Sequence, residues 1–260
     1  MILTKTRIKR SFAKASVTYD SVAELQRTAG RKLIKAIDAE RLKGCLLDLG
    51  CGTGFLTSQL EAYSNHDIVI ALDIALSMLQ TMQEKLVGQN GISYVCADAE
   101  HLPFVENSID SVFSNLALQW CSNLGGVFND IKRVLKPDGQ LVFSTFGPLT
   151  LHELKFAWAT VDNYNHVNTF YTKEQLHHFL YQSGFNNVDI KSTLYVSRYN
   201  SVWKLMQELK YLGAHHVIAG RNKKITTKTA MKNMIVAYER YKLGDKIPAT
   251  FEVINVIATV

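Results

Sequence analysis

The chain of 260 residues is 47% hydrophobic and has a formal net charge of +6, which suits one large α/β domain or two small ones. No run approaches the roughly 18 apolar residues that a membrane span needs, and the N-terminus lacks the apolar core of a signal peptide. We therefore expect a cytoplasmic protein with no membrane partner. The four cysteines lack C-x-x-C spacing, and three lie in or beside predicted strands, which predicts buried, reduced thiols rather than disulfides or zinc ligands.

The excess of positive charge is concentrated near the C-terminus. Residues 185–260 hold 12 Lys and Arg against 5 Asp and Glu, whereas residues 1–184 hold 17 against 18. Residues 1–19 form a second basic segment, because they contain five basic residues and no acid. Such an asymmetry can attract an acidic partner, although a solvated basic surface has the same pattern.

The first forty residues predict two helices. Residues 8–19 have the pattern of a short helix with an aromatic residue at its end. Asp20 or Ser21 is expected to cap the next helix, with Glu24 completing a capping box. Apolar residues at helical spacing then carry this second helix to about residue 40.

Residues 46–56 predict a strand, a tight turn and the start of a helix. An apolar run ends in Asp48 and is followed by glycine at every second position, namely Gly50, Gly52 and Gly54. Glycine accepts a positive φ and lets another molecule approach the backbone closely. The loop does not fit the dinucleotide pattern G-x-G-x-x-G/A in either register, so NAD is the weaker interpretation. The acid-then-glycine stretch resembles instead the first motif of the class I S-adenosylmethionine (SAM) methyltransferases.

An acid also ends the second predicted strand. After a helix over 55–63, the apolar run 67–73 predicts a buried parallel strand. It ends in Asp73, about 20 residues after Gly52, where a carboxylate can accept hydrogen bonds from a ribose diol. We assign Asp73, with the adjacent Ile74, to the cofactor site; a helix cap is the alternative role for this acid.

The third predicted strand, 92–99, follows a helix over 75–87 and contains another acid. In the class I methyltransferases, an acid at the end of the third strand and the next backbone amide meet the adenine ring. Asp98 and Ala99 match that position. The resemblance therefore implies that they bind adenine, whereas a loop cap is the alternative for Asp98.

Two further strands extend the parallel sheet. Strand 109–115 leads into residues 116–120, and strand 140–146 follows a helix over 124–135 that a Pro-Asp-Gly turn ends. Ligands bind beyond the carboxyl ends of parallel strands, so residues 114–120 should border the reacting methyl group, and Asn115 is assigned to the cofactor site. This stretch lacks the Asn-Pro-Pro-Tyr type of motif of amino-directed DNA methyltransferases, which argues against base methylation.

The chain beyond residue 147 is mostly helical. Two helices are expected within 148–183, each with a capping box, formed by Thr150 with Glu153 and by Thr172 with Gln175. A strand over 188–196 follows. Two amphipathic helices come next, over 202–212 and 231–241, and strand 250–257 closes the sheet as its antiparallel member.

The pattern as a whole predicts an α/β fold with a doubly wound, mostly parallel seven-stranded sheet, since strands that alternate with helices require right-handed crossovers. We expect residues 1–260 to form one domain. Its expected parts are a helical N-terminal cover at 1–42 and a SAM-binding core at 43–147. Two helical insertions, at 148–183 and 199–245, are expected on the substrate side.

The chain resembles one family more closely than the superfamily, the malonyl-acyl-carrier-protein O-methyltransferases of biotin synthesis. Four segments carry this resemblance, Phe12–Asp20, Ser114–Cys121, Phe143–Leu154 and Leu212–Arg221. One departure is His216, where the family has Asn after an Ala-His pair.

The resemblance implies that SAM esterifies the free carboxylate of a malonyl group carried by acyl carrier protein. The ester masks a charge, so that fatty-acid enzymes can extend the chain towards pimeloyl for biotin. A carboxylate with a pKa near ~4 is already ionised at neutral pH, so no general base is expected. No metal is expected either, because the eight histidines form no ligand pattern. Acyl carrier protein is acidic, and the basic segments would suit its malonyl-phosphopantetheine form as a partner.

Candidate residues on the acceptor side come from the resembling segments. Tyr19, Gln119 and Trp120 are assigned to positioning the methyl group and its acceptor, with packing as the alternative for the two aromatic residues. Four residues are assigned to the malonyl or carrier anions, with a solvated surface as the alternative for the cations: His215, His216, Arg221 and Lys224.

Two other functions stay open. One is a SAM-dependent methyltransferase of a free small carboxylic acid or quinone precursor, which would need no surface for a protein partner. The other is a non-catalytic SAM-binding or RNA-binding module, although the chain lacks the interleaved aromatic and basic residues of a recognised RNA module. We expect a monomer that binds no nucleic acid.

Overall fold

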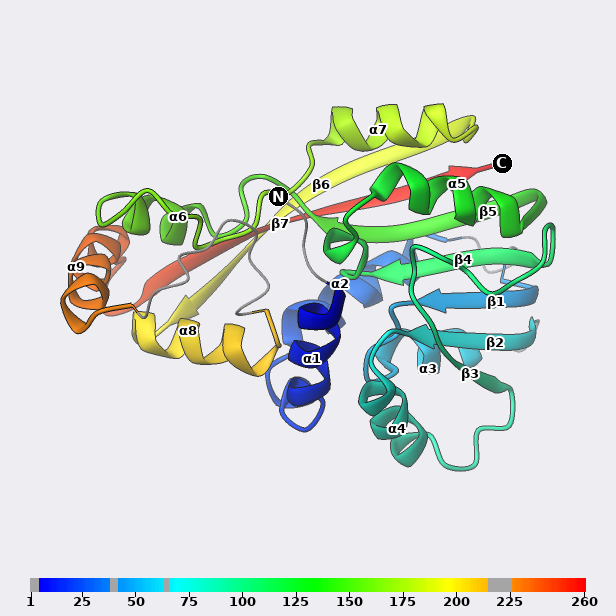
Figure 1. Ribbon diagram of the computed structural model, residues 1–260, viewed down its shortest axis with the longest axis horizontal. Coiled ribbons are helices and arrows are strands. Elements are labelled where there is room, and N and C mark those ends of the chain that lie inside the picture. Colours follow the sequence, from blue (N-terminus) through cyan, green and yellow to red (C-terminus); the bar gives the residue numbers. More distant parts are fainter. Residues whose placement is uncertain (1–4, 38–41, 63–65, 215–225) are drawn as a thin grey trace.

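The computed structural model describes residues 5–37, 42–62, 66–214 and 226–260. Within these residues a seven-stranded sheet has the order β3-β2-β1-β4-β5-β7-β6, with helices on both faces (Figure 1). The strands are β1 (Gly44–Leu49), β2 (His66–Asp73), β3 (Ile92–Cys96), β4 (Ile109–Asn115), β5 (Leu135–Phe146), β6 (Asn187–Tyr199) and β7 (Ile247–Thr259). The helices are α1 (Lys5–Ala15), α2 (Glu24–Lys35), α3 (Phe55–Glu61), α4 (Leu76–Lys85), α5 (Leu124–Val134), α6 (His152–Ala159), α7 (Lys173–Gln182), α8 (Val202–Tyr211) and α9 (Lys228–Tyr238).

The predicted sheet is confirmed. Strands β1 to β5 pair in parallel, and β7 runs antiparallel to both of its neighbours. The last strand was expected to close the sheet, but it lies between β5 and β6, so β6 is the edge strand. The strand order reverses between β1 and β4. A doubly wound sheet leaves room for ligands at such a reversal.

Alternating side chains on β1 explain why helices cover both faces of the sheet. Leu47 and Leu49 pack into a buried cluster with residues of α5 and α7. Leu46 points the other way, into a cluster with α2 and α3. A strand that is apolar on both faces has no side for water, which is why residues 46–49 read as a continuous apolar run apart from Asp48.

Strands β6 and β7 extend beyond the rest of the sheet and support a second core. Strand β5 pairs with β7 only from Val253 to Thr259, whereas β6 pairs with β7 along its whole length. The remaining two-stranded ribbon packs against α6, α8 and α9 (Figure 1). Buried residues of this second core include Trp158, Leu205, Tyr238 and Phe251. The two helices of the expected insertion at 148–183 therefore belong to different cores. Helix α6 packs in the second core, whereas α7 packs on the main sheet through Leu176 and Leu180.

The capping box predicted for the second helix is wrong. Residues Tyr19–Ser21 form a 3₁₀ turn, and α2 begins at Glu24 after Ala23, with no side-chain cap. Asp20 cannot cap the helix because its carboxylate accepts a hydrogen bond from Thr53 Oγ1 at 2.6 Å and pairs with Lys85 at 2.7 Å. Helix α2 ends at Lys35; the predicted continuation reaches residues 38–41, which lie outside the described part of the chain.

One of the two later capping boxes is confirmed. Thr172 accepts a hydrogen bond from Gln175 N while the Gln175 side chain accepts one from Thr172 N. The box at Thr150 and Glu153 is wrong, because α6 starts without a side-chain cap. Glu153 is 2% exposed, and its carboxylate instead accepts hydrogen bonds from the backbone N–H and the hydroxyl of Thr250 on β7.

The four cysteines are free thiols, as predicted, but their burial differs. Cys51 is buried and Cys96 is exposed, because β3 is the other edge strand. Among the described residues, no helix combines the length and apolar character that crossing a membrane requires.

Replacing Glu153 should destabilise the fold, because it joins α6 to β7 through two buried hydrogen bonds. We expect Glu153→Ala to lower the free energy of unfolding in urea by about 3 kcal/mol, since Thr250 loses both acceptors. The exposed Glu106 provides a matched control, and Glu106→Ala should change this free energy by less than about 0.5 kcal/mol. Equal effects of the two substitutions would contradict this role for Glu153.

Candidate active site

Two adjoining cavities lie beyond the carboxyl ends of the central strands. The first is bordered by the ends of β1, β2 and β4 and by α1, and the second by α2, β7 and the loop after α6. They measure about 720 and 730 Å³ including their openings to solvent, a volume typical of small-molecule sites. Phe12, Tyr19, Leu116 and Trp120 line both cavities and so form a shared wall.

The three glycines of the first loop have different surroundings. Gly50 and Gly52 line the first cavity, whereas Gly54 does not. All three have a positive φ. A side chain on Gly50 would collide with Ala117, and one on Gly54 with Met82, but a Cβ on Gly52 would enter open space. Gly50 and Gly54 are therefore required by packing, while Gly52 leaves room for a ligand to approach the backbone.

Asp48 lies beneath the loop rather than in the cavity. It is 1% exposed and accepts a hydrogen bond from Thr57 Oγ1 at 2.6 Å. Burial raises the pKa of its carboxyl group to about 7, although the bond from Thr57 favours the ionised form. The side chain of Asp48 thus bonds to α3 under the loop and does not line the first cavity, and its assignment to the cofactor site stays a prediction.

Asp73 lines the first cavity at the end of β2, and Ile74 follows it there. The Asp73 carboxylate accepts hydrogen bonds from Gly52 N at 3.0 Å and from Ala75 N at 2.8 Å. Burial raises the pKa of Asp73, and these backbone bonds oppose the shift. An ionised carboxylate can accept about four hydrogen bonds, so acceptor capacity remains for a ligand.

Asp98 and Ala99 line the far side of the first cavity. Lys5 on α1 reaches across and pairs with Asp98 at 2.6 Å and with Glu100 at 2.8 Å. Burial alone would lower the pKa of Lys5, but its hydrogen bonds to the two carboxylates raise it, so the lysine stays charged. The N-terminal helix is thereby held over the cavity by an ion pair.

Tyr19 stands at the shared wall and is held by its neighbour in the chain. Asp20 binds Thr53 of the glycine loop and Lys85 of α4, while Lys85 Nζ also donates to Thr53 O at 2.9 Å. Burial, followed by the charge of Asp73, raises the pKa of Tyr19 well above its usual range. Its hydroxyl therefore keeps its proton and can donate a hydrogen bond in the cavity.

Asn115 and Gln119 have their amides engaged by the protein. Asn115 Nδ2 donates to the Gln26 carbonyl oxygen at 2.9 Å, and its Oδ1 accepts from Ser144 Oγ at 2.7 Å. Gln119 Nε2 donates to the Leu116 carbonyl oxygen, and its Oε1 accepts from Thr145 Oγ1 at 3.3 Å. Asn115 lines the first cavity and Gln119 the second.

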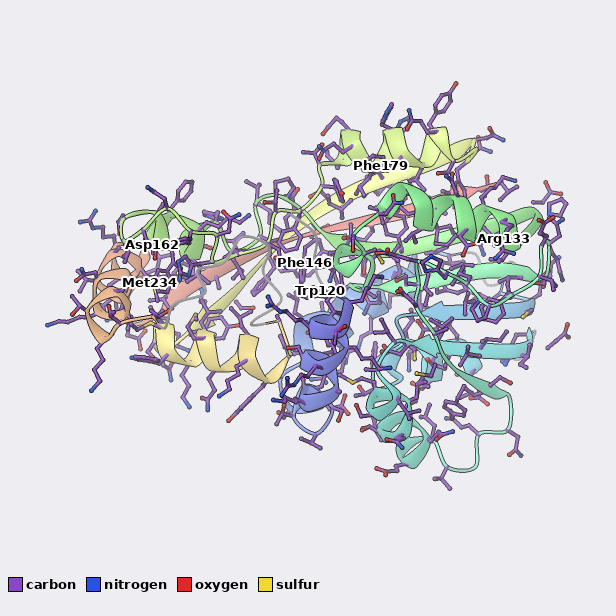
Figure 2. All side chains as sticks on the ribbon, in the orientation of Figure 1. Trp120, Arg133, Phe146, Asp162, Phe179 and Met234 are labelled. Atoms are coloured by element: carbon purple, nitrogen blue, oxygen red, sulfur yellow. The ribbon has the colours of Figure 1, made fainter. Side chains whose placement is uncertain are left out.

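Trp120 lies near the centre of the molecule, close to Phe146 (Figure 2). Its ring packs edge to face against Phe12 of α1, with ring centroids 5.4 Å apart. This contact and the ion pair of Lys5 were missed by the sequence analysis, because neither a charge nor an aromatic residue on a short helix indicates which strand end it will meet. The basic character of residues 1–19 was the available signal.

The four residues assigned to the malonyl or carrier anions lie outside the described part of the chain, between residues 215 and 225. These are His215, His216, Arg221 and Lys224. Over the residues that the structure does describe, no cluster of three or more His, Cys, Asp or Glu has a metal-binding arrangement.

The sequence is similar to those of known methyltransferases. A family model described as a methyltransferase domain matches residues 47–143. A malonyl-[acyl-carrier protein] O-methyltransferase of Methylovorus sp. (strain MP688) is 37% identical over 260 residues, which covers 97% of this chain and 88% of that relative. The biotin biosynthesis bifunctional protein BioHC of Cellvibrio japonicus (strain Ueda107) is 42% identical over 96% of this chain, and the chain spans about half (49%) of its length.

The fold is also that of solved methyltransferases. The crystal structure of a putative methyltransferase from Bacillus halodurans C-125 matches with a TM-score of 0.63 at 16% identity, covering 89% of this chain and 98% of that one. At this level of identity the likeness shows the fold alone, a seven-stranded, mostly parallel sheet with flanking helices.

Asp48 should make stability depend on pH. Its pKa is higher in the folded chain than in the unfolded one, so the folded state binds more protons and stability falls as pH rises from about 4 to about 7. Asp48→Asn keeps an acceptor for Thr57 without the buried charge. We expect the free energy of unfolding of the variant minus that of the wild type, measured by urea titration, to increase by about 2–3 kcal/mol from pH 5 to pH 8. A difference that does not change with pH would contradict the buried charge.

Proposed function

The chain belongs to the malonyl-[acyl-carrier protein] O-methyltransferase family, and from this membership we propose that it methylates the free carboxylate of malonyl-acyl carrier protein with SAM. The product, a malonyl methyl ester on the carrier, would prime pimeloyl synthesis for biotin. The observation that carries the proposal is the pair of cavities with a shared wall, since a donor in one can meet an acceptor in the other.

The residues of the first cavity fit SAM. The open space at Gly52 admits a ligand against the backbone, and the remaining acceptor capacity of Asp73 suits a ribose diol. Asp98 and Ala99 also line this cavity and would meet the adenine ring. SAM supplies an electrophilic methyl group on a sulfonium centre, and the protein has to orient that group towards the shared wall.

The shared wall supplies the groups that would position the acceptor. Tyr19 keeps its proton, so its hydroxyl can donate a hydrogen bond to an acceptor carboxylate. Trp120, packed on Phe12, excludes water from the contact between the two cavities. Gln119 retains one N–H beyond the hydrogen bond to Leu116 and can donate it to the same carboxylate.

A carboxylate acceptor requires no general base. It is ionised at neutral pH, and the opposite charges of carboxylate and sulfonium cancel as the methyl group moves. A largely apolar cavity favours this loss of charge, so alignment and exclusion of water would supply most of the rate enhancement. A free small acid or a quinone precursor could contact the same shared wall. Comparing the methylation rates of these compounds with that of the carrier-bound acid distinguishes the two functions.

An acidic carrier protein has a basic surface available next to the first cavity. Helix α1 exposes Arg7, Lys9, Arg10 and Lys14, while its buried residues Ile8 and Ser11 face the protein. Opposite charges raise the rate of association, and this contribution decreases with added salt.

Methyl transfer from labelled SAM to malonyl-carrier protein, with mass analysis of the product, tests the proposed function. We expect a mass gain of one methyl group on the malonyl thioester and much slower reaction with free malonate. Release of S-adenosylhomocysteine without a labelled carrier, or faster reaction with a free acid, would contradict it.

Asp73→Ala should weaken SAM binding, since the substitution removes the proposed ribose acceptor and the bond that holds Gly52 N. We expect the dissociation constant measured by calorimetry to rise at least about tenfold. Asp67→Ala, near the opposite end of β2, is the matched control and should leave the constant unchanged. Unchanged affinity in the Asp73 variant would remove the assignment.

A further inference from the structure

Two buried amide oxygens in the second cavity lack hydrogen-bond partners. Within the described residues, Gln26 Oε1 and Asn168 Oδ1 are buried without a partner, and both side chains line this cavity. The other two unpartnered side-chain oxygens, on Gln89 and Asn255, lie outside both cavities. Because buried polar groups in folded proteins are nearly always paired, two such oxygens in one cavity indicate a ligand that donates hydrogen bonds.

The two amides come from different elements that line the cavity. Gln26 belongs to α2, and its backbone carbonyl oxygen accepts the hydrogen bond from Asn115 Nδ2. Asn168 lies in the loop between α6 and α7, where His166 anchors the backbone two residues earlier. The His166 ring stacks on Trp158 with centroids 3.7 Å apart, and its Nε2 lies 2.9 Å from Asp162 Oδ1.

The remaining walls of the second cavity are mostly apolar. They include Phe146, Leu151, Leu154, Leu209 and Phe251, which come from the main sheet and the second core. The lining of the cavity includes Trp120 of the shared wall, Leu154 of α6 and Asn168 of the loop that follows α6. An acceptor that places its reacting group at the shared wall would therefore extend the rest of its chain past Gln26 and Asn168.

An ionised malonyl group cannot satisfy these oxygens, because it contains only hydrogen-bond acceptors. The phosphopantetheine arm can, since it carries two amide N–H donors separated by methylene groups and follows the thioester directly. Its methylenes and its dimethyl carbon suit apolar walls. On the basis of the proposed function, we propose that the second cavity holds this arm and that Gln26 and Asn168 accept hydrogen bonds from its amides.

Pantetheine itself is the direct probe, because it has the two amides and no malonyl group. We expect it to bind the wild-type protein saturated with S-adenosylhomocysteine in a calorimetric titration. Gln26→Leu and Asn168→Leu keep similar volumes without the acceptors, and each should raise the dissociation constant about tenfold. Gln89→Leu is the matched control, because it removes an equally unpaired amide outside the cavities and should leave the constant unchanged.

A substrate comparison provides a second readout that structural damage alone would not produce. With malonyl-carrier protein, kcat/KM should fall about tenfold in each variant, whereas with S-ethyl thiomalonate, which has no amide, it should change less than about twofold. Equal losses with both substrates, or pantetheine that fails to bind at millimolar concentration, would overturn the inference. If the wild type binds pantetheine, and the variants bind it more weakly, but the wild type transfers no methyl group, the proposed reaction is contradicted. The site for the arm is then still supported.

Discussion

The carboxylate of Asp73 fixes the ends of β1 and β2 relative to each other, and the first cavity depends on this constraint. Its two hydrogen bonds hold Gly52 N and Ala75 N, so the glycine loop and the start of α4 share one anchor. Thr53, one residue later, donates a hydrogen bond to Asp20 and accepts one from Lys85, and so attaches the Tyr19 turn to the same loop. The first cavity, the shared wall and the Tyr19 turn are therefore linked through a few polar contacts.

A second constraint is the length of β6 and β7. Because these strands continue past the end of β5, α6, α8 and α9 can form a core of their own beside the main sheet. The second cavity lies where this core meets the sheet, and its walls come from both. Under the proposed function, the main sheet would supply the donor side and the extended ribbon the acceptor side.

Local pattern was sufficient to predict the fold, since each strand of the parallel sheet is an apolar run between glycine or acidic residues and a helical segment. The same pattern predicted Gly52, Asp73 and Asp98 at strand ends, and all three line one cavity. Asp48 belongs to the same motif but does not line the cavity, because it lies inside β1 under the loop, where its carboxylate accepts a hydrogen bond from Thr57. The caps at Ser21 and Thr150 failed for another reason: their acidic partners or neighbours form long-range bonds, Asp20 with Thr53 and Glu153 with Thr250, that local sequence does not reveal.

The central claim is that donor and acceptor occupy adjoining cavities separated by Tyr19 and Trp120. A crystal structure of the protein with S-adenosylhomocysteine and malonyl-pantetheine tests it most directly. The account predicts ribose hydroxyls within hydrogen-bond distance of Asp73, the malonyl carboxylate beside Tyr19, and the pantetheine chain in the second cavity. A nucleoside bound away from Asp73, or an acyl chain outside the second cavity, would contradict it.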